Sequence, residues 1–139
     1  MVTERGRVEK IGGTPHERRT RLLRELPDGG RFFTYNGHCF DLPCIRDQLG
    51  IDLHDHFQSV DLRWVCQKNG ITGGQKRIER RFSITRKLPE MDGLDAIALW
   101  DRSQQGDEQA LCTLLLYNAE DINGLVTICR YLSNRGMVP

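Results

Sequence analysis

Residues 34–43 read TYNGHCFDLP, and this stretch decides how the rest of the chain is interpreted. The preceding residues, 31–35 (RFFTY), are aromatic and β-prone, which predicts a short buried strand. An Asn-Gly pair then breaks the strand. Asp41 follows within an otherwise apolar stretch, where it can cap a helix that reaches about Leu49. The alternative is that Asp41, at the carboxyl end of a strand, serves a metal ion or a phosphate.

Length and composition restrict the class of protein. A chain of 139 residues predicts one domain, 1–139, with a modest core. No apolar run approaches the ~20 residues of a membrane span, and MVTERGRVEK at the start lacks the apolar core of a signal peptide. The five cysteines include no CxxC pair, so neither a metal finger nor a disulfide framework is expected. We therefore expect a cytoplasmic protein with no membrane contact, whose thiols are reduced and mostly buried.

The order of the elements predicts an α/β fold whose C-terminal half is mostly helical. Thr14 should cap a first helix that runs to about Leu26, with its leucines turned inward. Residues 57–62 predict a second short strand. Further helices are expected at 64–68, 75–82 and 94–100, and from a cap at Asp107 to the end. The apolar residues of the helix at 94–100 recur at helical spacing, which predicts a buried face.

The charge is distributed unevenly along the chain. Residues 63–87 contain eight Lys or Arg against one acid, Glu79, whereas residues 90–121 contain eight acids against one base. The basic side chains Lys76, Arg77, Arg80 and Arg81 lie within two helical turns. They predict a surface that follows a phosphate backbone. An equally supported interpretation is a solvated helix face that pairs with the acidic stretch.

A second informative stretch is LLLYNAEDINGL, residues 114–125. Tyr117 and Asp121 are four residues apart, so they share one face of a helix, beside its apolar stripe. A carboxylate that borders a core is costly to desolvate unless its charge is compensated. A metal ion, a hydrogen bond or an arginine would each compensate it.

Taken together, these stretches resemble the ribonuclease H-like superfamily, in particular the DnaQ-type 3′→5′ exonucleases and their YprB-like domains. The resemblance covers roughly residues 17–135. It implies that Asp41 and Asp121 are metal ligands and that Tyr117 orients the attacking water. It also implies paired Mg²⁺ or Mn²⁺ ions that clamp the oxygens of a phosphodiester in DNA or RNA. Asn36 in the first motif joins the basic residues as a candidate nucleic-acid contact.

The chain departs from this family pattern at its start. The family begins with an apolar strand that carries an Asp-x-Glu pair, and nothing before Arg31 has that character. The nearest approach is residues 8–11 (VEKI), which are too short and too basic. We therefore expect a truncated sheet, with two of the four metal carboxylates, weak metal binding and little nuclease activity by the chain alone.

The incomplete sheet predicts assembly. An unpaired strand edge invites another chain, so we expect a homo-oligomer or a partner chain that completes the sheet. Three functions follow from these patterns. The first is an exonuclease-type domain that is inactive alone. The second is a nucleic-acid-binding domain that does not cut, and the third is a protein-interaction subunit. Asp61, in the stretch SVDLRW, is expected to cap a turn or helix rather than to bind a metal.

Overall fold

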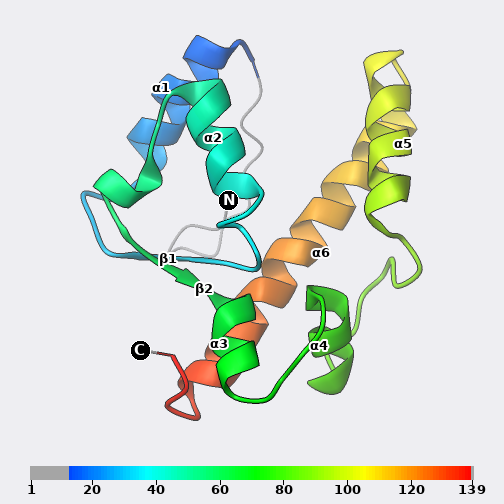
Figure 1. Cartoon of the computed structure of the whole chain (residues 1–139). Coiled ribbons are helices and arrows are strands. Elements are labelled where there is room, and N and C mark those ends of the chain that lie inside the picture. The colour runs from blue at the N-terminus through cyan, green and yellow to red at the C-terminus, as the bar shows by residue number, and fades with distance from the viewer. Residues whose placement is uncertain (1–12, 139) are drawn as a thin grey trace.

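The computed structural model describes residues 13–138, and a two-stranded parallel sheet lies at its centre (Figure 1). In chain order the elements are α1 (Pro15–Glu25), β1 (Arg31–Thr34), α2 (Asp41–Leu49), the 3-10 helix η1 (Leu53–Asp55), β2 (Gln58–Asp61), α3 (Leu62–Lys68), α4 (Gln75–Arg81), α5 (Gly93–Gln104) and α6 (Glu108–Ser133). Parallel strands require a crossover, which α2 and η1 supply here. The small parallel sheet and its helices fit the expected α/β class.

The first helix begins as predicted. The backbone N–H of Glu17 donates to the Thr14 hydroxyl at 3.3 Å, and the Thr14 backbone N–H donates to the Glu17 carboxylate at 2.7 Å. This reciprocal capping box satisfies two backbone donors at the helix start. Leu22 is buried, as expected, but Leu23 is exposed. The expectation for Leu23 is wrong because the next residue of a helix points ~100° away from the buried face.

The hydrophobic core gathers around β2 and the C-terminal half of α6. Its buried members come from β2, α3, α4, α6 and the segment after α3: Val60, Leu62, Val65, Cys66, Ile71, Ile78, Ile128 and Leu132. Phe33 and Tyr35 pack against this cluster but stay partly exposed. The predicted strand at 31–35 is therefore confirmed, although it is less buried than expected. Within residues 13–138 it pairs along one edge only, with β2, and residues 8–11 lie outside the described part.

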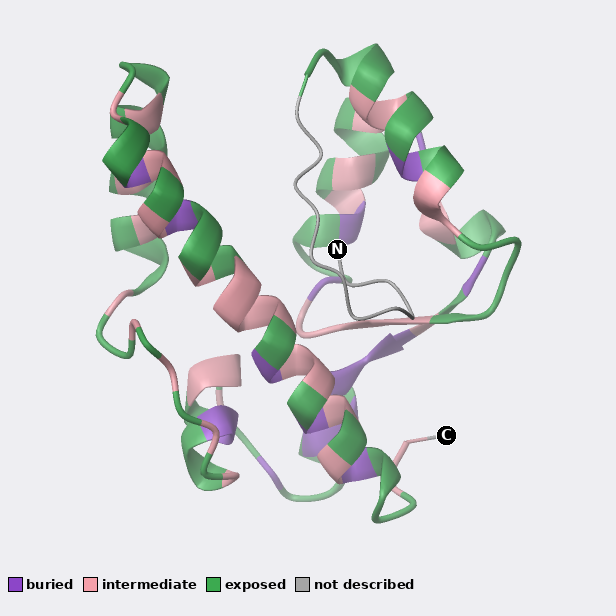
Figure 2. Ribbon diagram, turned by 180° about the vertical axis from the view of Figure 1, so that it is seen from behind, coloured by how far each residue is buried: buried purple, intermediate pink, exposed green. Residues whose placement is uncertain are grey.

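The C-terminal helices form at the predicted positions. Asp107 caps α6, since its carboxylate accepts the Ala110 N–H at 2.9 Å. The predicted buried face of α5 is wrong: Leu94, Ile97 and Trp100 are 76%, 59% and 50% exposed, and no residue of α5 is buried. In Figure 2 the exposed colour covers most of α5 and of the neighbouring part of α6. The reason is that, among the described elements, α6 is the one that α5 packs on extensively, so one helix covers one narrow side of it.

The cysteines and the hydropathy agree in part with expectation. All five thiols are free, but the expectation that most are buried is wrong: Cys66 is buried, Cys129 is partly buried, and Cys39, Cys44 and Cys112 are exposed. Within residues 13–138 no helix combines the length and the apolar character that a membrane span requires.

Candidate functional site

Asp41 does not cap α2 with its side chain. Phe40 occupies the cap position and makes no side-chain capping hydrogen bond, and Asp41 is the first helical residue. The backbone already provides the turn, because the N–H of Leu42 donates to the carbonyl of Gly37 at 2.9 Å. The prediction that Asp41 caps α2 is therefore wrong. The Asp41 carboxylate is left available for another role.

Asp61 holds the loop that precedes α2. Its side chain is buried, and its carboxylate accepts the backbone N–H groups of Asn36 at 2.7 Å, His38 at 3.3 Å and Arg63 at 3.0 Å. The bond from Arg63 makes Asp61 the cap of α3, as expected. Asn36 has a positive φ of 64°, which the tight turn requires. The Asn36 side-chain oxygen accepts a hydrogen bond from Arg63 at 2.6 Å, so this predicted nucleic-acid contact also holds the loop.

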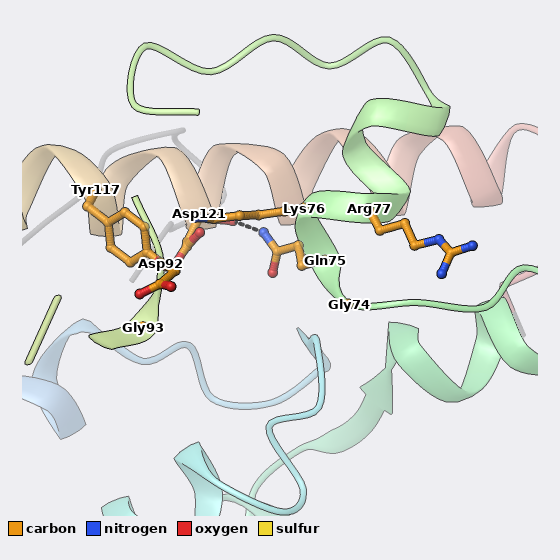
Figure 3. A pocket seen from close by; sticks show the side chains of 8 residues that line it. All are labelled: Gly74, Gln75, Lys76, Arg77, Asp92, Gly93, Tyr117 and Asp121. Atoms are coloured by element: carbon orange, nitrogen blue, oxygen red, sulfur yellow. Dashed lines mark hydrogen bonds between the residues drawn. The ribbon is translucent and has the colours of Figure 1, made fainter. Parts of the chain in front are cut away.

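Tyr117 and Asp121 line one pocket of about 330 Å³. Figure 3 shows both side chains directed from α6 towards the first turn of α4, with the start of α5 close to the tyrosine ring. The other lining residues come from α4 and its approach, Gly74, Gln75, Lys76 and Arg77, and from the start of α5, Asp92 and Gly93. The helical spacing of Tyr117 and Asp121 thus brings a phenol and a carboxylate to the same pocket.

An arginine compensates the charge of Asp121. Nη1 of Arg86 lies 2.6 Å from Oδ1 of Asp121, and the Arg86 side chain is almost fully buried. Arg86 also forms a two-bond contact with the buried carboxylate of Glu79, through Nε and through Nη2 at 2.7 Å. Of the three compensating groups that the sequence left open for Asp121, the structure shows an arginine.

The pKa values of the Asp121 and Asp41 carboxyl groups reflect their burial and the charges near them. Burial raises the pKa of the Asp121 carboxyl, and Arg86 lowers it only in part. Desolvation raises the pKa of Asp41, although the residue is exposed overall, and the negative charges of Asp61 and Asp121 raise it further. The charge of Asp121 is the smallest of these effects. Asp41 is not among the residues that line the pocket of Tyr117 and Asp121.

Tyr117 remains a neutral phenol. Burial and the charge of Asp121 raise the pKa of its hydroxyl. The Lys76 ammonium lies 4.8 Å from the centre of the Tyr117 ring, a cation–π distance. Lys76 Nζ is shielded from solvent and has no hydrogen-bond acceptor among the described residues. Lys76 therefore belongs to the pocket rather than to the outer basic surface that its sequence position predicted.

The remaining basic residues of α4 are on the outside. Arg77, Arg80 and Arg81 are exposed, and Arg77 also lines the pocket. The acidic stretch pairs with the basic stretch at a few points only: Arg86 contacts Asp121, and the Glu120 carboxylate accepts two backbone N–H groups after it. The pairing interpretation therefore holds at these points, and phosphate binding by the exposed arginines stays a prediction.

The carboxylates of the described residues do not fit a two-metal centre by themselves. Hard dications need several oxygen ligands. Across residues 13–138 no group of three or more His, Cys, Asp or Glu side chains could hold a metal ion. One oxygen of Asp121 already pairs with Arg86. Asp41 and Asp121 could supply part of such a site, and the other ligands must come from elsewhere.

Comparison with family models places the chain. A model described as RNase_H superfamily matches residues 10–133. The chain belongs to the ribonuclease H superfamily. Neither the curated proteins nor the solved structures gave a match. Membership suggests a nuclease-like domain that acts on nucleic acid.

Sequence reasoning missed Glu79 and Arg86, which hold Asp121. One signal was present: Glu79 is the sole acid among the basic residues 63–87. An isolated acid within a basic helix is expected to pair, but its partner Arg86 is seven residues away in a segment without regular structure. Helical spacing therefore could not identify the partner.

Proposed function

We propose that this chain contributes the nucleic-acid-binding surface and part of the metal site of a DnaQ-type 3′→5′ exonuclease. The observation that carries the proposal is the pocket in which Tyr117 and Asp121 lie beside the basic helix α4. A superfamily that acts on nucleic acid makes a phosphodiester the expected ligand. Arg77, Arg80 and Arg81 would contact phosphates, and Tyr117 would donate a hydrogen bond to the attacking water.

The proposal requires carboxylates from outside residues 13–138. Asp41 and Asp121 are two possible ligands for Mg²⁺ or Mn²⁺, which would supply Lewis-acid activation of the phosphodiester when bound. A strand that pairs with the second edge of β1 would lie beside the strand that leads into the loop before Asp41. Such a strand, from further polypeptide, a second copy or a partner chain, would add the remaining carboxylates. Light scattering at micromolar concentration tests the second-copy version.

The binding surface is tested by the salt dependence of affinity. Fluorescence anisotropy with labelled single-stranded DNA and RNA should show log Kd rising with log salt, with a slope of about 0.7 per phosphate contact. The double variant Arg77→Glu/Arg81→Glu should abolish binding to every sequence. Arg24→Glu/Arg46→Glu makes the same change in net charge on the exposed surfaces of α1 and α2 and serves as the control. Equal losses in both double variants would show non-specific attraction only.

A second candidate is a domain that binds nucleic acid without cutting it. The ion pair between Arg86 and Asp121 favours this second function, because the guanidinium contacts a carboxylate oxygen that a metal ion would need. A 5′-labelled single strand incubated with Mg²⁺ separates the two functions. Shortening of the strand from its 3′ end that disappears in Asp121→Asn would establish the exonuclease. Binding without shortening of the nucleic acid would establish the non-cutting domain. The same result must hold after addition of a polypeptide that supplies the missing β-strand.

A further inference from the structure

Helices α5 and α6 form an antiparallel hairpin, connected by residues 105–107, and they lie side by side (Figure 1). Its inner side includes the partly buried Leu99 of α5 and the buried Leu114 of α6. One residue further along each helix the chain has turned by ~100°, which places Trp100 and Leu115 beside that inner side. Because the two helices run in opposite directions, the equal turn brings both side chains to the same side of the hairpin.

An apolar surface extends over this side of the hairpin. Ile97 precedes Trp100 by three residues, and Leu111 precedes Leu115 by four, so each pair shares one face of its helix. We call the surface of Ile97, Trp100, Leu111 and Leu115 the hairpin face. Solvent contacts most of it, since Ile97 is 59% exposed, Trp100 50% and Leu115 36%. Neighbouring exposed apolar side chains mark an interaction site, whereas single ones do not.

The charges around the hairpin face restrict the chemistry of its occupant. Asp101 lies one helical turn after Ile97, and Glu108 lies one turn before Leu111, so both acids border the face. Both are exposed. Arg102, the sole base of the acidic stretch, is already paired within the hairpin. A surface of this charge repels phosphate groups, so neither a nucleic acid nor an anionic membrane fits it.

The same charges disfavour a second copy of the face. Two hairpin faces in contact would bring Asp101 and Glu108 of both chains together, and like charges across an interface are costly. The occupant is also not a strand, because a helix offers no free backbone edge to pair with. A third helix fits, since its side chains can pack into the groove between two others. The 12 residues of α5 extend over ~18 Å, the length of about three helical turns.

We propose that the hairpin face binds a basic amphipathic helix of another protein. Such a helix carries apolar side chains at i, i+3 or i+4, and i+7, which cover the apolar residues of the hairpin face. Lys and Arg beside this apolar stripe reach Asp101 and Glu108 at the border. The interaction is separate from the pocket of Tyr117 and Asp121, and it does not depend on whether the domain cuts nucleic acid.

The probe is a fluorescein-labelled synthetic peptide of about 18 residues, long enough to form a helix, with leucines along one face and lysines elsewhere. Fluorescence anisotropy with the whole chain measures its Kd, and NMR maps its site. The amides of residues 97–100 and 111–115 should shift most. A second peptide has the same composition, but its leucines are spread around the helix. It should bind at least ~10-fold more weakly, because it cannot present an apolar stripe.

Two neighbouring leucines provide a matched pair of variants. Leu115→Ser removes an apolar group from the hairpin face and should weaken binding of the first peptide at least ~5-fold. Leu116 is exposed to a similar extent, 38%, but points ~100° away, so Leu116→Ser should leave the affinity unchanged. Asp101→Asn/Glu108→Gln should weaken binding at least ~3-fold at low salt. That difference should vanish at high salt, which screens exposed charges.

Four outcomes would overturn the proposal. The first is that the amides of the hairpin face do not shift when the leucine-striped peptide is added. The second is equal binding of the two peptides, and the third is an equal loss in Leu115→Ser and Leu116→Ser. Each of these would show non-specific attraction or none. The fourth is a dimer in light scattering that becomes a monomer in Leu115→Ser, which would identify a second copy as the occupant.

Discussion

The two halves of α6 lie in opposite surroundings. Residues 122–133 pack against β1 and α4 and include Ile128 and Leu132, whose side chains are completely buried. Residues 108–116 include the buried Ala110 and Leu114, and the helix that packs most extensively on α6, α5, has no buried residue. We call residues 122–133 together with β1, β2, α3 and α4 the body. We call residues 108–116 together with α5 the arm. Tyr117 and Asp121 lie in α6 between these two ranges, and Figure 1 shows the course of that helix.

The two regions are stabilised by different interactions. The body buries a contiguous hydrophobic cluster, which is the main source of folding free energy. The arm buries only Ala110 and Leu114, and hydrogen bonds hold its helix ends: Asp92 and Asp95 form a capping box at the start of α5, and Asp107 caps α6. A site at the junction therefore has one wall that is rigid and one wall, the start of α5, that is held by its cap. The following substitutions measure this difference.

The largest expected effect is in the body. Ile128→Ala should lower the free energy of unfolding by about 3 kcal/mol, because it removes a fully buried side chain from the core. Ile97→Ala makes the same change on the exposed arm and should alter it by less than about 0.5 kcal/mol. Urea unfolding monitored by circular dichroism measures both values. Similar values for the two would mean that the arm is buried by a partner in solution.

A smaller effect is expected at the contact between α4 and α6. Gly124→Ala should destabilise by about 1–2 kcal/mol, because its methyl group overlaps the held carboxylate of Glu79. Improved helix propensity offsets part of this cost. The matched control is Gly93→Ala in α5, which has nothing within 4 Å of the new methyl group and should be neutral or stabilising. A stabilised Gly124→Ala variant would show that Glu79 moves freely.

The cap of α5 should contribute less to overall stability. Asp92 accepts the N–H groups of Leu94 at 2.7 Å and Asp95 at 3.1 Å, so Asp92→Ala should cost about 1 kcal/mol. Amide hydrogen exchange should rise across α5 and the adjoining turns of α6, while β2 keeps its protection. Asp92→Asn retains an acceptor and should keep most of the protection. Exchange that rises equally in the body would contradict a separate arm.

Sequence patterns predicted the positions of helices and strands better than they predicted which side chains are buried. The caps at Thr14 and Asp107 and the strand at 31–35 depend on residues close in the chain, and they form where expected. The apolar spacing of α5 predicted burial, but periodicity states only which residues share a face, not whether another element covers it. Asp41 was misjudged as a cap for a related reason, since a backbone bond to Gly37 already ordered that turn.

Sequence spacing predicted that Tyr117 and Asp121 share one face of a helix, but not which group compensates the charge of Asp121. Tyr117 and Asp121 share a pocket because α6 fixes their spacing. The partner of Asp121 is Arg86, which reaches it from a segment without regular structure after α4. Such a contact depends on how α4 and α6 pack around Gly124 and on a non-periodic loop. No local pattern records it.

The smallest expected effect is the response of the arm to acid. The pKa of Asp107 lies below its usual 3.8, because it accepts the N–H of Ala110 and pairs with Arg102. The stabilisation from a lowered carboxyl pKa is fully present above the unfolded value and is lost as the pH falls through the folded one. The pKa of Asp121 is raised, so its protonation relieves rather than costs stability. Acidification below about pH 4 should therefore loosen the arm before the body.

Amide exchange of Ala110 and its neighbours between pH 5 and pH 2.5, corrected for the intrinsic rate, measures this loosening. Asp107→Asn is the control, because its side-chain oxygen still accepts the Ala110 N–H but no longer titrates. That variant should lose the acid response of the first turn of α6 while Ile128 in the body behaves as before. If the amides of both regions lose protection together, the arm unfolds only with the body, and the junction at Tyr117 and Asp121 is not a boundary between two regions of different stability.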